Sequence, residues 1–84
     1  MVALDDVPAS PTSPTPGYGR RIRHARLAVN KTRHELADAV GITAGSVLRY
    51  ELERMAPSEK NLIRIAKVTR VTAAYLMFGQ ALLS

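Results

Sequence analysis

The sequence of 84 residues contains no cysteine. Without thiols the chain can form neither a disulfide nor a thiolate metal site, which is typical of a reducing cytoplasm. No apolar run approaches the roughly 18 residues of a membrane helix, and the N-terminus lacks the basic and apolar segments of a signal peptide. We therefore expect one small cytoplasmic domain with no membrane partner.

The residue patterns of catalytic and cofactor sites are also missing. His24 and His34 lie ten residues apart, which is not a metal-ligand spacing. No serine, histidine and acid are arranged as a catalytic triad, and no glycine-rich loop suggests nucleotide binding. We therefore expect no metal, no cofactor and no enzymatic activity.

Charge is distributed unevenly along the chain. Residues 1–19 carry only Asp5 and Asp6, whereas residues 20–84 carry twelve Lys or Arg against five acidic residues, a net charge of +7. A compact domain with this excess attracts polyanions, foremost nucleic acid and after it an anionic membrane surface. Charge that only keeps a small protein soluble is the plainer interpretation.

Four of the five prolines lie within residues 7–17. Such a segment cannot bury a core, so residues 1–17 are predicted to be a disordered or extended Pro/Ser/Thr-rich tail. The spacing of the prolines is compatible with a PxxP ligand, and three hydroxyl residues that precede a proline are candidates for phosphorylation, but a plain tail is favoured; these three are Ser10, Ser13 and Thr15.

From Gly19 onward the sequence has helical periodicity with regular stop and start signals. It predicts an all-α domain over 18–79, with helices over 18–29, 33–40, 44–52, 59–69 and 73–78, and a short extension over 80–84. Thr32, Thr43, Ser58 and Thr72 are the predicted N-caps, and Thr32 with Glu35 forms a capping box. The predicted inward residues are Ile22, Ala25, Val29, Leu36, Ala37, Val40, Val47, Leu62, Ile65 and Ala66.

Residues 33–50 carry the functional signal. Two short helices are separated by a tight turn at Gly41, with the small Ala37 where the helices would cross and Val47 where the second helix would meet the core. This combination predicts a helix-turn-helix, whose second helix is free to enter the DNA major groove.

At these residues the chain resembles the lambda-repressor and Cro class of helix-turn-helix regulators. The resemblance covers about 22–79 and rests on Thr32-x-x-Glu35-Leu36-Ala37, Gly41-Ile42-Thr43, Val47-x-Arg49-Tyr50-Glu51 and Tyr75-Leu76-x-x-Gly79. It implies a five-helix bundle, usually dimeric, whose third helix reads DNA, and a structural ion pair between Arg26 and Glu51. The sequence departs from the family at Ala44 and Gly45, which replace long polar side chains, and at Glu53 and Arg70, which replace glycines.

The resemblance, together with the positions of side chains on the predicted helices, gives the candidate contact residues. Candidates for base contact are Thr43, Ala44, Gly45, Ser46, Leu48 and Arg49, with Arg49 favoured because arginine bound to guanine is the commonest specific contact. Candidates for phosphate contact are Arg33, Arg54, Lys60, Asn61 and Arg23. Candidates for the dimer interface are Tyr75, Met77, Phe78, Leu82 and Leu83, although these side chains could instead pack onto their own core.

The basic residues Arg20, Arg21 and Arg23 begin the first helix, where they oppose its macrodipole; this suggests an anionic partner or a solvated basic end. The function favoured by the sequence is a homodimeric, sequence-specific transcriptional regulator, most simply a repressor of bacterial or phage type. A protein-interaction module is the first alternative, because the third helix is less polar than a typical DNA-recognition helix. The residues that make it so are Ala44, Gly45, Leu48 and Leu52. Nonspecific architectural DNA binding is the second alternative.

Overall fold

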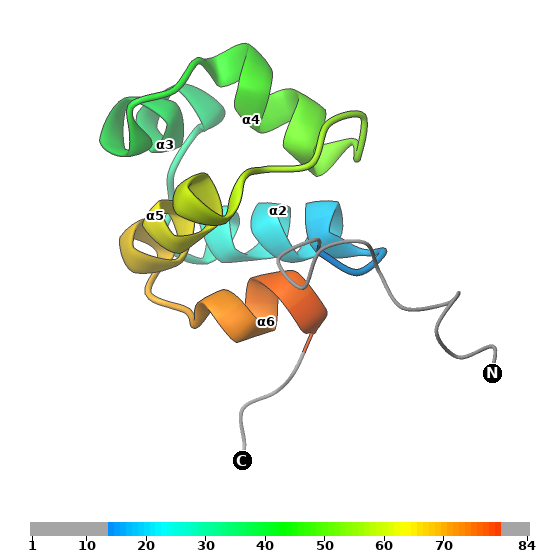
Figure 1. Cartoon of the computed structure of the whole chain (residues 1–84). Coiled ribbons are helices and arrows are strands. Elements are labelled where there is room, and N and C mark those ends of the chain that lie inside the picture. The colour runs from blue at the N-terminus through cyan, green and yellow to red at the C-terminus, as the bar shows by residue number, and fades with distance from the viewer. Residues whose placement is uncertain (1–13, 80–84) are drawn as a thin grey trace, which may run out of the picture.

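The computed structural model describes residues 14–79, and within this range the chain is all helical. Five helices follow one another with short connections, labelled α2 to α6 in Figure 1. Their bounds are Tyr18–Ala28 (α2), Arg33–Val40 (α3), Ala44–Glu51 (α4), Glu59–Thr69 (α5) and Ala73–Phe78 (α6). The predicted fold class is thereby confirmed for the described residues, with α2 and α4 each ending one residue earlier than expected.

The helix starts are set by the hydroxyl residues that the sequence marked. Thr32, Thr43, Ser58 and Thr72 each accept a hydrogen bond from the backbone N–H three residues ahead. In return the Thr32 N–H donates to the Glu35 carboxylate at 2.8 Å, which completes the capping box. These caps satisfy N–H groups that have no partner inside the helix, so they fix where each helix begins.

A single core holds the helices together. Fully buried side chains come from every helix and include Ile22, Leu36, Val47, Leu62, Ile65 and Leu76. Figure 1 shows α3 and α4 at one end of the molecule, α2 and α5 in the middle, and α6 at the opposite end. Val29 was predicted to face inward but is only half-buried, because α2 has already ended at Ala28 and Val29 forms its C-cap.

The domain begins earlier than the sequence pattern suggested. Thr15 was assigned to the tail, yet its N–H and its hydroxyl both donate to the Met77 carbonyl, at 2.7 and 3.0 Å. Arg21 holds this segment in place by donating to Thr15 and Pro16 on one side and to the carbonyls of Leu76 and Met77 on the other. Arg21 is therefore a structural clamp between the start of α2 and the end of α6. Residues 1–13 and 80–84 lie outside the described residues.

Candidate nucleic-acid interface

The turn between α3 and α4 has the geometry that the sequence predicted. Gly41 ends α3 with a φ of 89°, a left-handed conformation that glycine adopts without strain, and its N–H donates to the Ala37 carbonyl at 2.7 Å. Ala37 on α3 and Val47 on α4 are both buried in the core. The buried face of α4 therefore locks onto α3 and the core, which leaves its opposite face free.

The outer face of α4 contains the side chains predicted to meet bases. Gly45, Leu48 and Arg49 are exposed, and Ala44 and Ser46 are half-buried. The Thr43 hydroxyl accepts from the Ser46 N–H at 3.0 Å and donates to the Ser46 hydroxyl at 3.1 Å, so these two hydroxyls already bind each other. An arginine, an apolar side chain and a bare stretch of backbone thus lie together on one exposed helical surface.

Arg49 lies along its own helix rather than straight out from it. Its Nη1 atom is 3.5 Å from the position that a Cβ atom at Gly45 would take, and Thr43 Oγ1 is 3.8 Å from the same position. The guanidinium therefore reaches back over Gly45 toward the start of α4. The absence of a side chain at Gly45 leaves room for this conformation.

One ion network ties α2, α3 and α4 together. The Glu51 carboxylate accepts from Arg26 Nε at 2.6 Å and Arg26 Nη2 at 3.2 Å, the pair that the family resemblance implied. It also accepts from Arg33 Nε at 3.0 Å, a bond that sequence reasoning missed. Arg33 is therefore both a candidate phosphate ligand and a partner of the buried acid. No local sequence signal joins positions 33 and 51, since the bond depends on how α3 and α4 pack.

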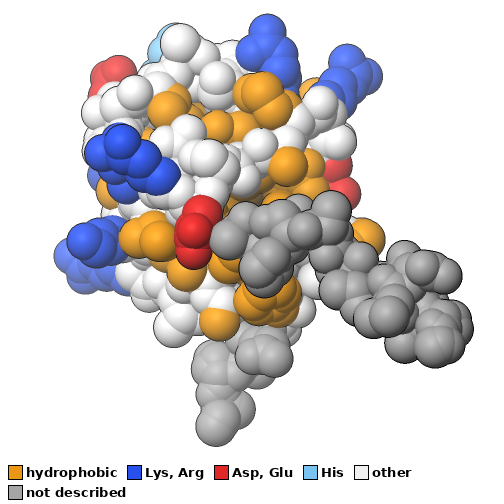
Figure 2. Space-filling view, viewed as in Figure 1, with side chains coloured by type: hydrophobic (Ala, Val, Ile, Leu, Met, Phe, Trp, Pro, Cys, Tyr) orange, Lys and Arg blue, Asp and Glu red, His pale blue; other side chains and the backbone are white. Residues whose placement is uncertain are grey.

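The other candidates for phosphate contact lie on α2, on the loop after α4 and at the start of α5. Arg23, Arg54 and Lys60 are exposed. Asn61 is half-buried, and its Nδ2 donates to the Tyr50 hydroxyl at 3.1 Å, which fixes its side chain against α4. Figure 2 shows Lys and Arg side chains projecting at the α3–α4 end and along one side of the molecule.

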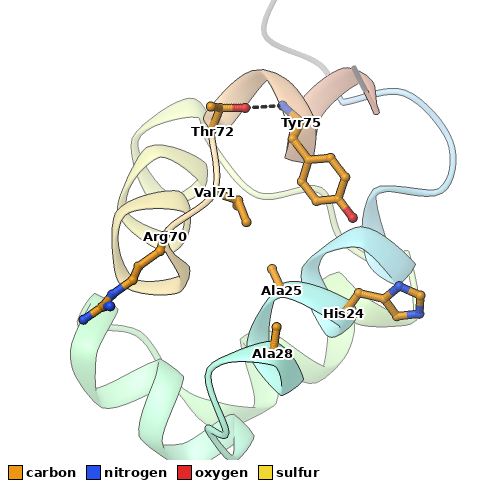
Figure 3. A pocket seen from close by; sticks show the side chains of 7 residues that line it. All are labelled: His24, Ala25, Ala28, Arg70, Val71, Thr72 and Tyr75. Atoms are coloured by element: carbon orange, nitrogen blue, oxygen red, sulfur yellow. Dashed lines mark hydrogen bonds between the residues drawn. The ribbon is translucent and has the colours of Figure 1, made fainter. Parts of the chain in front are cut away.

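The α6 end holds the residues proposed for dimer contacts. Met77 is buried in the core of its own chain, which agrees with the alternative that these side chains pack inward rather than against a partner. Phe78 is 43% exposed, Tyr75 is half-buried, and Leu82 and Leu83 lie outside the described residues. A hollow of about 620 Å³ lies between α2 on one side and the α5–α6 connection with the start of α6 on the other, where Figure 3 shows Tyr75 and Val71 facing Ala25 and Ala28.

Within residues 14–79, no group of three His, Cys, Asp or Glu side chains could hold a metal ion. In the same part of the chain, no helix is both long and apolar enough to cross a membrane.

Comparison with known proteins agrees with this geometry. A helix-turn-helix family model matches residues 22–76, which include all of α3, α4 and α5. The chain belongs to the helix-turn-helix family. It is of the lambda-repressor and Cro type, a family of transcriptional regulators and not of enzymes.

Curated relatives of this helix-turn-helix chain are regulators of similar type. It is 35% identical over 52 residues to the cryptic phage CTXphi transcriptional repressor RstR of Vibrio cholerae, which covers 62% of this chain and 46% of that protein. It is 34% identical over 61 residues to the HTH-type transcriptional regulator DicA of Escherichia coli, which covers 73% of this chain and 45% of that protein. The chain spans about half the length of the curated relatives it matches.

Solved helix-turn-helix structures have the same fold. The P22 c2 repressor protein, solved in complex with a synthetic operator, matches with a TM-score of 0.74 and 26% identity over 79% of this chain and 100% of that chain. The N-terminal DNA binding domain of SinR from Bacillus subtilis matches with a TM-score of 0.68 and 24% identity over 71% of this chain and 88% of that chain, which shows a common fold.

Proposed function

We propose that this chain binds double-stranded DNA in a sequence-specific manner and thereby regulates transcription, most simply as a repressor in the cytoplasm. The observation that carries the proposal is the exposed face of α4 at one end of the molecule, held by the buried Arg26–Glu51 pair. A helix presented in this way fits the major groove. The match to a repressor solved with its operator supports the same arrangement.

Arg49 is the residue proposed to read a base. Its guanidinium lies over Gly45 and forms no ion pair within residues 14–79, so its donors are available. Arginine binds the O6 and N7 atoms of guanine with two hydrogen bonds, which is worth about 1–3 kcal/mol of discrimination. Thr43, Ala44, Gly45, Ser46 and Leu48 would line the same groove, with Leu48 placed to touch a thymine methyl group.

The phosphate contacts are proposed for Arg23, Arg33, Arg54, Lys60 and Asn61. Lys60 offers a direct comparison with Lys67, because both are exposed and lie seven residues apart, about two turns, on the same side of α5. Lys60 is near the α4 end of α5 and Lys67 is near the far end. Affinity for DNA falls as salt rises, and Lys60→Ala should make the slope of log affinity against log salt shallower by about 0.9. Lys67→Ala should leave this slope nearly unchanged.

A homodimer is proposed from the α6 end. The exposed Phe78, the half-buried Tyr75 and the hollow beside it form an apolar surface on the side opposite α3 and α4. A two-fold dimer would place its two α4 helices on half-sites roughly 34 Å apart in a pseudo-palindromic operator. Analytical ultracentrifugation of Phe78→Glu against the matched control Ile63→Glu, which changes another exposed apolar residue, tests this surface.

The central experiment is a selection from randomised duplex DNA at two salt concentrations. A symmetric enriched motif is the expected result, and Arg49→Ala should lose preference at one position in each half-site while Lys67→Ala retains it. Salt-sensitive binding without a motif would instead indicate architectural DNA binding. No binding at either salt concentration would contradict the proposal.

A protein-interaction module is the second candidate function. Leu48 on α4 is 39% exposed, and Leu52, the C-cap of α4, is 54% exposed, which makes an apolar pair one turn apart. On this alternative, Leu48→Glu abolishes a protein complex while DNA affinity is negligible for both the variant and the unmodified chain. On the DNA proposal, the unmodified chain binds DNA and Leu48→Glu weakens that binding.

A further inference from the structure

Glu51 is a buried acid that binds two arginines of different helices. Its side chain is 2% exposed, and its two oxygens accept from Arg26 Nε at 2.6 Å, Arg26 Nη2 at 3.2 Å and Arg33 Nε at 3.0 Å. One carboxylate therefore faces two guanidinium groups. The cluster has an excess of one positive charge.

The two arginines differ in exposure. The Arg26 side chain is 7% exposed, and its Nη1 donates to the Lys31 carbonyl at 2.9 Å, so its donors are directed into the protein. The Arg33 side chain is 40% exposed. The excess positive charge of the cluster therefore reaches the surface mainly through Arg33.

The helix positions of the two paired residues explain why Arg33 needs an anchor. Arg33 is the first residue of α3, and a positive charge at the N-terminus of a helix is unfavourable against the helix dipole. Glu51 is the last residue of α4, and a negative charge at the C-terminus of a helix is unfavourable for the same reason. Each charge is unfavourable on its own helix, and the bond between them brings the acid to the positive end of α3. Glu51 thereby holds a guanidinium at a place where an unpaired arginine would turn away into solvent.

The bond to Glu51 uses only the Nε atom of Arg33. Within residues 14–79, the Nη1 and Nη2 atoms of Arg33 form no hydrogen bond or ion pair, so both are available to an outside acceptor. A phosphate group accepts two parallel N–H bonds from a guanidinium, and a lysine cannot reproduce this fork.

We infer that Glu51 is a positioning residue for DNA binding, which fixes the Arg33 guanidinium at the start of α3 so that Nη1 and Nη2 bind one DNA phosphate. This inference rests on the proposed function. Because the side chain is fixed before DNA arrives, less conformational entropy is lost on binding. The acid that locks α4 to the core thus also sets the affinity of α3 for the phosphate backbone.

The test compares DNA affinity across a salt series for the unmodified full chain, Glu51→Gln, Arg33→Gln and the double variant. Glu51→Gln removes a negative charge, so general electrostatics predicts tighter DNA binding, whereas positioning predicts binding weaker by about three- to tenfold. Arg33→Gln should lower the salt slope by about 0.9. Once Arg33 is replaced, Glu51→Gln should weaken binding less than it does when Arg33 is present, because only its effect through the Arg26 pair remains. Glu59→Gln, at an exposed acid on α5, is the control for loss of one negative charge.

Arg33→Lys keeps the test valid if Glu51→Gln does not fold, because it leaves the Arg26–Glu51 pair intact. It should retain the full salt slope yet bind DNA about three- to tenfold more weakly than the unmodified chain, since lysine lacks the Nε anchor. Affinity equal to that of the unmodified chain would overturn the inference. Equal weakening by Glu51→Gln with and without Arg33 would overturn it as well.

Different results would contradict the proposed function and the positioning role of Glu51. If the unmodified chain binds no DNA at any salt concentration, the proposed function fails and the inference with it. If it binds DNA and Arg33→Gln retains the full salt slope, only the inference fails.

Discussion

Glu53 has two opposite effects on stability: its side chain caps a helix, and its backbone is strained. Its φ is 58°, in the left-handed region, where the related family usually has glycine. Its carboxylate Oε2 accepts from the N–H groups of Gly17 and Gly19, both at 2.9 Å, at the start of α2. That helix has no side-chain cap of its own and no acid in its first turn. Glu53 therefore caps α2 from across the molecule, at the expense of backbone strain.

The magnitudes of the two effects predict an order of stability at position 53. A capping side chain is worth about 0.5–2 kcal/mol, and a negative charge near a helix N-terminus adds about 0.3–1 kcal/mol. Left-handed backbone costs a residue with a side chain roughly 1–2 kcal/mol. Glu53→Ala loses the cap and keeps the strain, so it should destabilise the fold by about 2 kcal/mol. Glu53→Gly loses the cap but relieves the strain, so it should cost less than about 1 kcal/mol.

Urea unfolding followed by circular dichroism measures these differences for the full chain. The expected order of unfolding free energy is Glu, then Gly, then Ala at position 53, with Gly about 1 kcal/mol above Ala. Glu59→Ala, which removes an exposed acid from the first turn of another helix, serves as the control for loss of a charge. If Glu53→Ala is as stable as the unmodified chain, the capping argument is refuted.

Three further predictions concern single side chains. Gly19→Ala should destabilise the fold by about 1–3 kcal/mol, because its Cβ would stand 2.3 Å from the Glu51 carbonyl oxygen; a urea midpoint equal to that of the unmodified chain would contradict this packing. Gly45→Ala, the same change in an open helical site, should raise stability by up to about 1 kcal/mol in the same assay, and a lower midpoint would show that Gly45 is needed for the fold. Burial, with a contribution from the Glu53 carboxylate, raises the pKa of the Tyr18 hydroxyl above its usual value near 10. The contribution of the neutral Tyr18 hydroxyl to the free energy of unfolding is therefore complete below about pH 10, and it is lost as the pH rises through the pKa of the folded state. The difference in unfolding free energy between the unmodified chain and Tyr18→Phe should shrink at high pH, and a constant difference would refute this.

The sequence alone determined the helices, because their limits depend on local interactions. A cap such as Thr43 binds a backbone N–H only three residues away, and the left-handed turn at Gly41 follows from the absence of a side chain at that one position. Spacing also identified Ala37 on α3 and Val47 on α4 as buried residues. Binary patterning was less accurate at a helix end, since Val29 has the right spacing for the core but follows the last turn of α2.

Only the tertiary structure decided which charges meet. Arg33 and Glu51 are 18 residues apart, Glu53 and Gly17 are 36 apart, and Arg21 and Leu76 are 55 apart. An arginine side chain has the same local pattern whether it binds a buried acid, a carbonyl group or solvent, so no periodicity distinguishes these roles. The packing of α3 against α4, and of α2 against α4 and α6, selects the partners, because long, flexible side chains bond to whatever acceptor the fold brings within reach.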